Sequence, residues 1–140
     1  MISNGGKEVV GIFRLAPDKD DCNWTKKQLN DGEFEKCDDV NIFANLIKVW
    51  FRELPEGLLD CVEEKNILKI AEMKPGETVM KAFETIWGEE RTKKNIFLWL
   101  LDLCCEICEN EAVNKMTTKN IAICVSPNLS VGRASEAREL

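Results

Sequence analysis

The chain has 140 residues, of which 44% are hydrophobic and 31% are charged, a balance typical of one soluble globular domain. Its formal net charge is −6, which disfavours extensive binding to nucleic acid or to an anionic membrane. The chain contains no histidine, so Ser-His-Asp and Cys-His catalysis and histidine-ligated metal sites are excluded in their usual forms.

The periodicity of apolar residues predicts helices along the chain, with little of the alternation that marks strands. A short helix is expected over 23–29 and is closed by the turn sequence at 30–32. The segment 40–54 carries apolar residues at helical spacing, and Pro55 ends it.

Three further helices are expected in the middle of the chain. Asp60 is predicted to cap the first, with Glu63 completing a capping pair. A second covers 77–87, and Gly88 suits the left-handed position beyond its end. The third and longest covers about 93–109, with Thr92 as its cap, and is apolar nearly all round, which indicates a central place in the domain.

The last predicted helix begins at Thr117 or Thr118 and continues through 121–125 until Pro127 ends it. The apolar residues 121–125 alone would also suit a strand, but the polar segment before them favours a helix. The sequence therefore predicts a single all-α domain.

Targeting signals are not evident in this sequence. Residues 1–7 lack the apolar segment of a secretory signal. The longest apolar run, 96–101, is far shorter than the ~20 residues needed to cross a membrane. We therefore expect a cytoplasmic protein without a transmembrane segment.

Seven cysteines are present, and Cys105 and Cys108 have the C-x-x-C spacing of some metal and redox sites. A zinc site needs about four suitable ligands, and neither a second such pair nor a histidine accompanies this one. We expect free, mostly buried thiols and no metal site. A metal or thiol enzyme built on Cys105 and Cys108 is the least favoured reading.

The polar residues of the segment 40–54 fall on one helix face, at Asn41, Asn45, Lys48 and Arg52. A solvated helix face is one reading of this pattern. The other is a docking face for an acidic or phosphate-bearing partner. The spacing does not separate the two.

Arg14 follows two bulky apolar residues, Ile12 and Phe13, which are expected to be buried and to leave the arginine at the surface. A guanidinium group so held has the permanent charge and rigid set of donors that stabilise developing phosphate charge. By itself, however, it is also an exposed arginine like many others.

Three segments, in this order, resemble the RhoGAP domain, the all-α module that activates GTP hydrolysis by Rho-family small GTPases. They are GIFR at 11–14, the segment 39–56 that ends in LIKVWFRELPE, and NKMTTKNIA at 114–122 followed by SPNL at 126–129. The resemblance implies a helical bundle over 11–129. It also implies that 1–10 is a leader where the family's first helix is truncated, and that 130–140 is a C-terminal tail or the start of a last helix.

The resemblance also implies roles for single residues. Arg14 matches the arginine finger, which enters the nucleotide site of the GTPase and supplies charge in trans. Lys48 matches a lysine that contacts the GTPase, and Arg52 an arginine that mainly holds the finger loop. Asn128 matches an asparagine that contacts the partner's switch region, and Asn120 a mostly structural position.

The resemblance implies a GTPase-activating protein with no hydrolase activity and no cofactor of its own, because GTP and magnesium are held by the partner GTPase. One departure lies next to Arg14, where Leu15-Ala16-Pro17 stands in place of the small residue and glycine usual in the family. The alternative is an interaction module of the same fold that binds a GTPase or another partner without activating hydrolysis. The presence of Arg14 favours the activator.

Overall fold

A computed structural model of the chain describes residues 1–130, apart from the side chains of residues 4 and 77. Every regular element within this part is helical, which confirms the predicted all-α class. In chain order the elements are η1 (Ile2–Asn4), α1 (Lys19–Asp31), α2 (Val40–Arg52), α3 (Glu64–Ala71), α4 (Glu77–Thr85), α5 (Arg91–Cys108), α6 (Glu111–Asn114), α7 (Thr118–Val125) and η2 (Ser126–Asn128).

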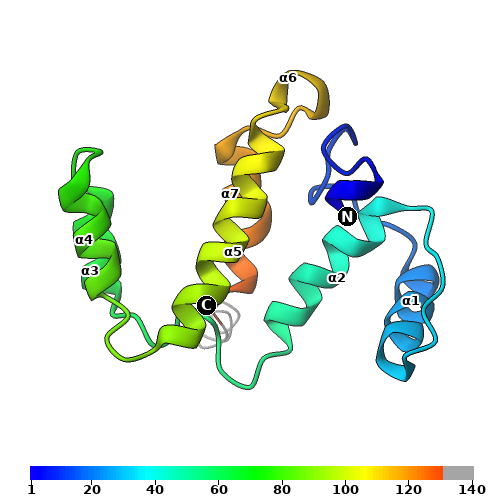
Figure 1. Ribbon diagram of the computed structural model, residues 1–140, viewed down its shortest axis with the longest axis horizontal. Coiled ribbons are helices and arrows are strands. Elements are labelled where there is room, and N and C mark those ends of the chain that lie inside the picture. The colour runs from blue at the N-terminus through cyan, green and yellow to red at the C-terminus, as the bar shows by residue number, and fades with distance from the viewer. Residues whose placement is uncertain (131–140) are drawn as a thin grey trace, which may run out of the picture.

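The longest helix, α5, runs through the middle of the molecule, and α7 packs against it (Figure 1). On one side of α5 lie α2 and α1, which pack on each other, and α2 also contacts η2. On the other side the α3–α4 pair stands apart from the rest (Figure 1). The fold thus consists of a central body with one helical pair attached to it.

The core joins the segment before Arg14 to the central helices. Ile12 and Phe13 are 0% and 1% exposed, and they belong to one apolar cluster with residues of α2, α5 and α7. Other members of this cluster are Phe51, Leu58, Leu100, Ile107, Met116, Ile121 and Val125. The prediction that Ile12 and Phe13 are buried and Arg14 is exposed is therefore confirmed.

The α3–α4 pair is held to the body through aromatic rings. Phe97 of α5 lies 5.6 Å from Phe83 and 5.4 Å from Trp87, measured between ring centroids. An ion pair of 2.7 Å between Lys93 of α5 and Glu56 adds a link to the segment before α3. We therefore expect the attachment to depend strongly on these three rings.

Two predicted caps are wrong. Helix α3 begins at Glu64, and Asp60 does not cap it, because its carboxylate accepts the Gly57 N–H at 2.9 Å instead. Helix α5 begins at Arg91, so that Thr92 lies inside its first turn rather than at its cap. At Asp60 the local capping pattern is outweighed by this bond within the preceding turn.

The other helix boundaries agree with the sequence prediction in part. Helix α1 is longer than predicted because Asp18 accepts hydrogen bonds from the next turn, at 2.9 and 3.0 Å, and starts the helix at Lys19. Thr117 caps α7, as one of the two predicted starts, and accepts the Asn120 N–H at 3.2 Å. The segment 121–125 is helical, and Gly88 has the expected positive φ of 54°. The short helix α6 was not predicted.

The central helix α5 is less enclosed than its composition predicts. Trp99 is 53% exposed and Leu101 is 39% exposed. Trp99 faces a groove of about 1460 Å³ between α2 and α5, which Trp50 of α2 also lines. None of the four candidate site residues lines this groove.

The cysteines are free thiols, as expected, but most of them are not fully buried. Cys22 is buried, Cys105 is exposed and the other five lie between these extremes. Burial raises the pKa of the Cys104 thiol to about 12, so that this thiol is protonated near neutral pH.

Candidate functional site

Residues 11–15, called here the 11–15 loop, form a tight turn that presents Arg14 to solvent. Gly11 and Phe13 both have positive φ, of 76° and 69°. The backbone N–H groups of Arg14 and Leu15 both donate to the Gly11 carbonyl, each at 2.9 Å. Phe13 can hold a conformation that is unfavourable for a bulky residue because its ring is buried in the core.

The Arg14 side chain lies over the start of its own loop. Its Nη2 atom is 3.5 Å from the position that a Cβ atom on Gly11 would occupy. No ion pair involves Arg14 within residues 1–130, so its charge is not neutralised by a carboxylate there. The nearby Asp18 has its carboxylate engaged in capping α1.

Lys48 of α2 supports the 11–15 loop directly. Its ammonium group donates to the Phe13 carbonyl at 2.7 Å, one residue before Arg14. Burial lowers the pKa of Lys48, and the positive charge of Arg52, one turn further along α2, lowers it further. The interaction fixes the peptide that precedes the arginine.

Arg52 and Asn128 form the neighbouring pair. Arg52 donates from Nη1 to Asn128 Oδ1 at 2.8 Å. The amide nitrogen of Asn128 donates to the carbonyls of Cys124 and Val125, both at 3.0 Å. Asn128 is only 6% exposed, so its side chain is oriented by the end of α7 and faces Arg52 rather than solvent.

The hydrogen bonds distribute the support of the loop differently from what the resemblance implied. Within residues 1–130, the side-chain bond to the 11–15 loop comes from Lys48, whereas Arg52 bonds to Asn128. The polar face of α2 is also not simply solvated, since Asn45 donates to Cys22 Sγ of α1 at 3.5 Å. Through Lys48, Asn45 and Arg52, this face of α2 contacts the 11–15 loop, α1 and η2, respectively.

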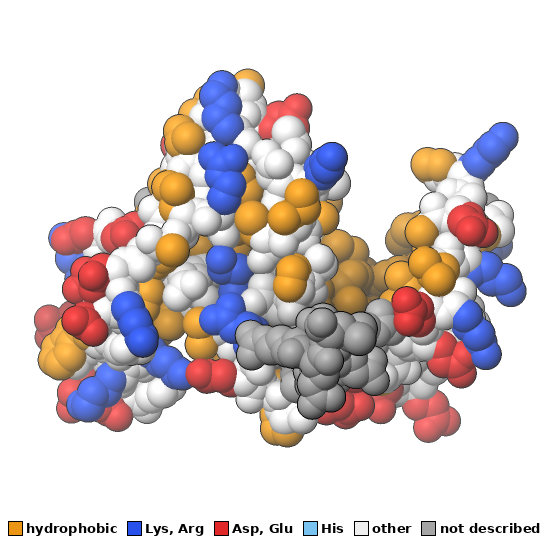
Figure 2. Space-filling model, turned by 180° about the vertical axis from the view of Figure 1, so that it is seen from behind, with side chains coloured by type: hydrophobic (Ala, Val, Ile, Leu, Met, Phe, Trp, Pro, Cys, Tyr) orange, Lys and Arg blue, Asp and Glu red, His pale blue; other side chains and the backbone are white. Residues whose placement is uncertain are grey.

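Positive side chains are gathered in part on one face of the molecule. Figure 2 shows several lysine and arginine side chains in a line down the middle of this face, with further basic side chains and the acidic side chains toward its two sides. The local arrangement therefore departs from the overall charge of −6.

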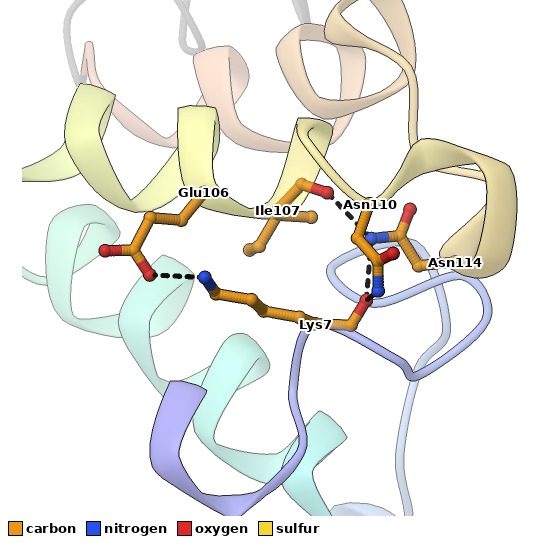
Figure 3. Close-up of polar contacts among 5 residues, drawn as sticks. All are labelled: Lys7, Glu106, Ile107, Asn110 and Asn114. Carbon is orange, nitrogen blue, oxygen red and sulfur yellow. Dashed lines mark hydrogen bonds and ion pairs between the residues drawn. The ribbon is translucent and has the colours of Figure 1, made fainter.

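A second set of contacts, not foreseen from the sequence, joins the 11–15 loop and the segment before it to the residues that follow α5. The Gly11 N–H donates to the Asn114 carbonyl at 2.8 Å. The side chains of Asn110 and Asn114 both donate to the Lys7 carbonyl (Figure 3). Asn114 lies in the NKMTTKNIA motif, but nothing in the sequence shows that it faces a residue more than one hundred positions earlier.

Asn120 has a structural place, as the resemblance implied. Its side-chain amide donates to the Lys115 carbonyl at 3.1 Å, and its backbone N–H is bonded to Thr117. Lys115 itself has a positive φ of 62°. Asn120 therefore stabilises the turn between α6 and α7.

Metal and membrane features were searched over the described part of the chain. Residues 1–130 contain no group of three or more Cys, Asp or Glu side chains placed to hold a metal ion. The described helices include none with the length and apolar character needed to span a bilayer.

Comparison with known proteins places the chain in a family. The RhoGAP domain family matches residues 1–133. The chain is 35% identical over 129 residues to Rho GTPase-activating protein gacA of Dictyostelium discoideum, and this match covers 92% of the chain and 36% of that protein. It is 34% identical over 130 residues to Rho GTPase-activating protein 2 of Arabidopsis thaliana, with 93% and 29% covered. The chain thus spans about a third of the length of these relatives.

Solved structures share the fold. The BH domain from GRAF, the GTPase regulator associated with focal adhesion kinase, superposes with a TM-score of 0.73 at 20% identity, over 92% of this chain and 72% of that one. Human Rho GTPase activating protein 15 gives a TM-score of 0.75 at 20% identity, over 92% and 64%. The chain belongs to the RhoGAP domain family, which confirms the resemblance drawn from its three motifs.

Proposed function

We propose that this domain binds a GTP-loaded Rho-family small GTPase and accelerates hydrolysis by supplying Arg14 in trans. The observation that carries the proposal is the geometry of the 11–15 loop. Phe13 is 1% exposed in the core, its carbonyl is bonded to Lys48 at 2.7 Å, and the next residue, Arg14, is exposed. An unpaired arginine on a firmly held loop is suited to entering a partner's site.

The chemistry requires little from this chain beyond a positioned charge. Hydrolysis of GTP spreads negative charge over the phosphoryl oxygens in the transition state. A guanidinium group keeps its proton at any physiological pH and can bond two oxygens at once. An arginine supplied in this way is worth roughly 10³–10⁵ in rate, which corresponds to about 4–7 kcal/mol of barrier. GTP and magnesium belong to the GTPase, and this chain needs no cofactor of its own.

The other three site residues support and extend this contact. Lys48 holds the peptide before Arg14 and adds positive charge beside it. Arg52 lies one turn further along α2 and is exposed, so it is available to the GTPase at the rim of the contact. Asn128 acts through Arg52, because its amide is engaged by Arg52 and by the end of α7.

The test compares wild-type domain with Arg14→Ala in single-turnover GTP hydrolysis by a panel of Rho-, Rac- and Cdc42-type GTPases. We expect Arg14→Ala to keep the half-saturating concentration within a few-fold and to lose most of the acceleration. Arg91→Ala is the matched control, since Arg91 is an exposed arginine at the opposite end of α5 from the 11–15 loop. The domain incubated with GTP alone should release no phosphate.

The second candidate function is a module that binds a GTPase without activating it. It predicts that wild type and Arg14→Ala bind the GTP-loaded partner equally and that neither accelerates hydrolysis. Acceleration by Arg14→Ala equal to that of wild type, with the partner bound, refutes the assignment of Arg14 as the residue that supplies the charge.

A further inference from the structure

Asn114 is the most completely bonded polar residue around the 11–15 loop. It is 0% exposed and ends the short helix α6. Its amide nitrogen donates to the carbonyls of Lys7 at 2.9 Å and of Ile107 at 2.7 Å. Its amide oxygen accepts the Met116 N–H at 2.8 Å, and its own carbonyl accepts the Gly11 N–H at 2.8 Å.

These contacts fix which way the amide group points. Its nitrogen faces two carbonyl oxygens, and its oxygen faces an N–H group (Figure 3 shows the two carbonyl contacts). Rotating the amide by half a turn would set oxygen against oxygen and nitrogen against nitrogen. Aspartate has almost the same shape but no N–H donor, so it would remove one bond from each carbonyl, set a carboxylate oxygen against both carbonyl oxygens and add charge in a buried place.

Two of the residues that Asn114 bonds precede Arg14 in the chain. Lys7 precedes the loop, and Gly11 begins it. The Gly11 carbonyl in turn accepts hydrogen bonds from the backbone N–H groups of both Arg14 and Leu15. Asn114 and Gly11 thus form one connected path of hydrogen bonds from the end of α5 to the backbone of the arginine.

Two neighbours reinforce the same path. Asn110 donates to the Lys7 carbonyl at 3.0 Å, so this carbonyl has two amide donors. The Lys7 ammonium group pairs with Glu106 of α5 at 3.3 Å, which holds the side chain along that helix (Figure 3). Removing Asn110 therefore weakens the hold on Lys7 without leaving its carbonyl bare.

We propose that Asn114 is a positioning residue for Arg14, which sets where the arginine sits by fixing the backbone at two points before it, Lys7 and Gly11. The inference rests on the proposed function of Arg14. Lys48 and the buried Ile12 and Phe13 hold the far part of the loop independently of Asn114. Loss of the Asn114 amide donor therefore leaves the loop attached but misplaces its start, which lowers catalysis more than binding.

The experiment measures single-turnover GTP hydrolysis by a responsive GTPase at increasing concentrations of the Asn114→Asp domain. The titration gives two quantities, the plateau rate at saturating domain and the half-saturating concentration. We expect the plateau rate to fall about tenfold or more, since misplacement by ~1 Å costs on the order of a hundredfold, while the half-saturating concentration changes less than about threefold. The matched control is Asn120→Asp, which removes one amide donor in the same corner without touching 7–15. It should retain the wild-type plateau.

A double-mutant cycle shows whether the effect passes through the arginine. In an Arg14→Ala background, Asn114→Asp should change the plateau rate by less than twofold. An equal loss in both backgrounds, or a plateau no lower than that of Asn120→Asp, overturns the inference while the proposed function stands. If wild type does not accelerate hydrolysis at all, both are overturned together.

Asn110→Ala keeps the inference testable if Asn114→Asp does not fold. This variant removes one of the two donors to Lys7. We expect faster amide hydrogen exchange at 11–15 and a several-fold lower plateau rate, with exchange in α2 unchanged. Unchanged exchange and an unchanged plateau rate in this variant count against the positioning role.

Discussion

Gly11→Ala should separate the strain that the 11–15 loop tolerates from the activity it supports. Gly11 has a φ of 76°, which costs an L-residue about 1–2 kcal/mol. An added Cβ would also lie 3.1 Å from Leu15 Cγ, but Leu15 is half-exposed and can move aside. The stability loss should therefore be close to the backbone cost alone.

The backbone cannot rotate away from this strain without losing contacts. The Gly11 N–H is bonded to Asn114, and its carbonyl accepts from Arg14 and Leu15. Each of these bonds contributes about 0.5–1.5 kcal/mol, so breaking them costs at least as much as the strain. We therefore expect Gly11→Ala to relieve part of the strain by a small shift of the backbone that carries Arg14.

Gly32→Ala is the matched control. Gly32 has nearly the same φ, 73°, at the end of α1, and nothing lies within 4 Å of an added Cβ. Both variants should lose about 1–2 kcal/mol, or about 3–10 °C in Tm for a domain of this size. Only Gly11→Ala should lower the plateau rate of GTP hydrolysis, by roughly tenfold or more. Equal plateau rates in the two variants would refute the reasoning.

Three further outcomes follow from other parts of the structure. Burial lowers the pKa of Lys48 from its ordinary 10.5, so between the lowered value and 10.5 the unfolded chain binds more protons and stability rises with pH. In Lys48→Met the urea midpoint should therefore rise less between pH 8 and 10.5 than in the wild type. Identical slopes of midpoint against pH in the two proteins would contradict this. Phe97→Ala removes two ring pairs, each worth roughly 0.5–1.5 kcal/mol beyond burial. It should speed amide exchange in α3 and α4 but not in α2, and uniform exchange would show that the joint is not local. Iodoacetamide at pH 8 should label the exposed Cys105 well before Cys104, whose pKa of about 12 leaves little thiolate. Equal labelling by mass spectrometry would argue against burial of Cys104.

The helices other than α6 were predictable from the sequence because of their apolar spacing, and the end of α1 was predictable because Gly32 follows it. The start of α3 was not, since Asp60 and Glu63 have the right spacing for a cap but the Asp60 carboxylate bonds to Gly57 instead. Such a choice depends on where the preceding loop lies, which local spacing does not contain.

The site shows the same division between local and long-range information. Burial of Phe13 and exposure of Arg14 follow from the order of residue types, and the structure confirms both. The pairing of Lys48 with Phe13 and of Arg52 with Asn128 joins positions 35 and 76 residues apart. The sequence resemblance identified these residues but not which one touches which.

The direct attachment of Arg14 to a core residue has a consequence for inherited variation. Phe13 contributes to the same apolar cluster as Leu100 and Ile107, so a substitution deep in α5 that tilts this ring also displaces the next residue. Alleles that impair activation should therefore arise at interior positions as well as on the outer face. Those alleles that leave the domain folded would keep partner binding, and would be missed by any screen that scores only association.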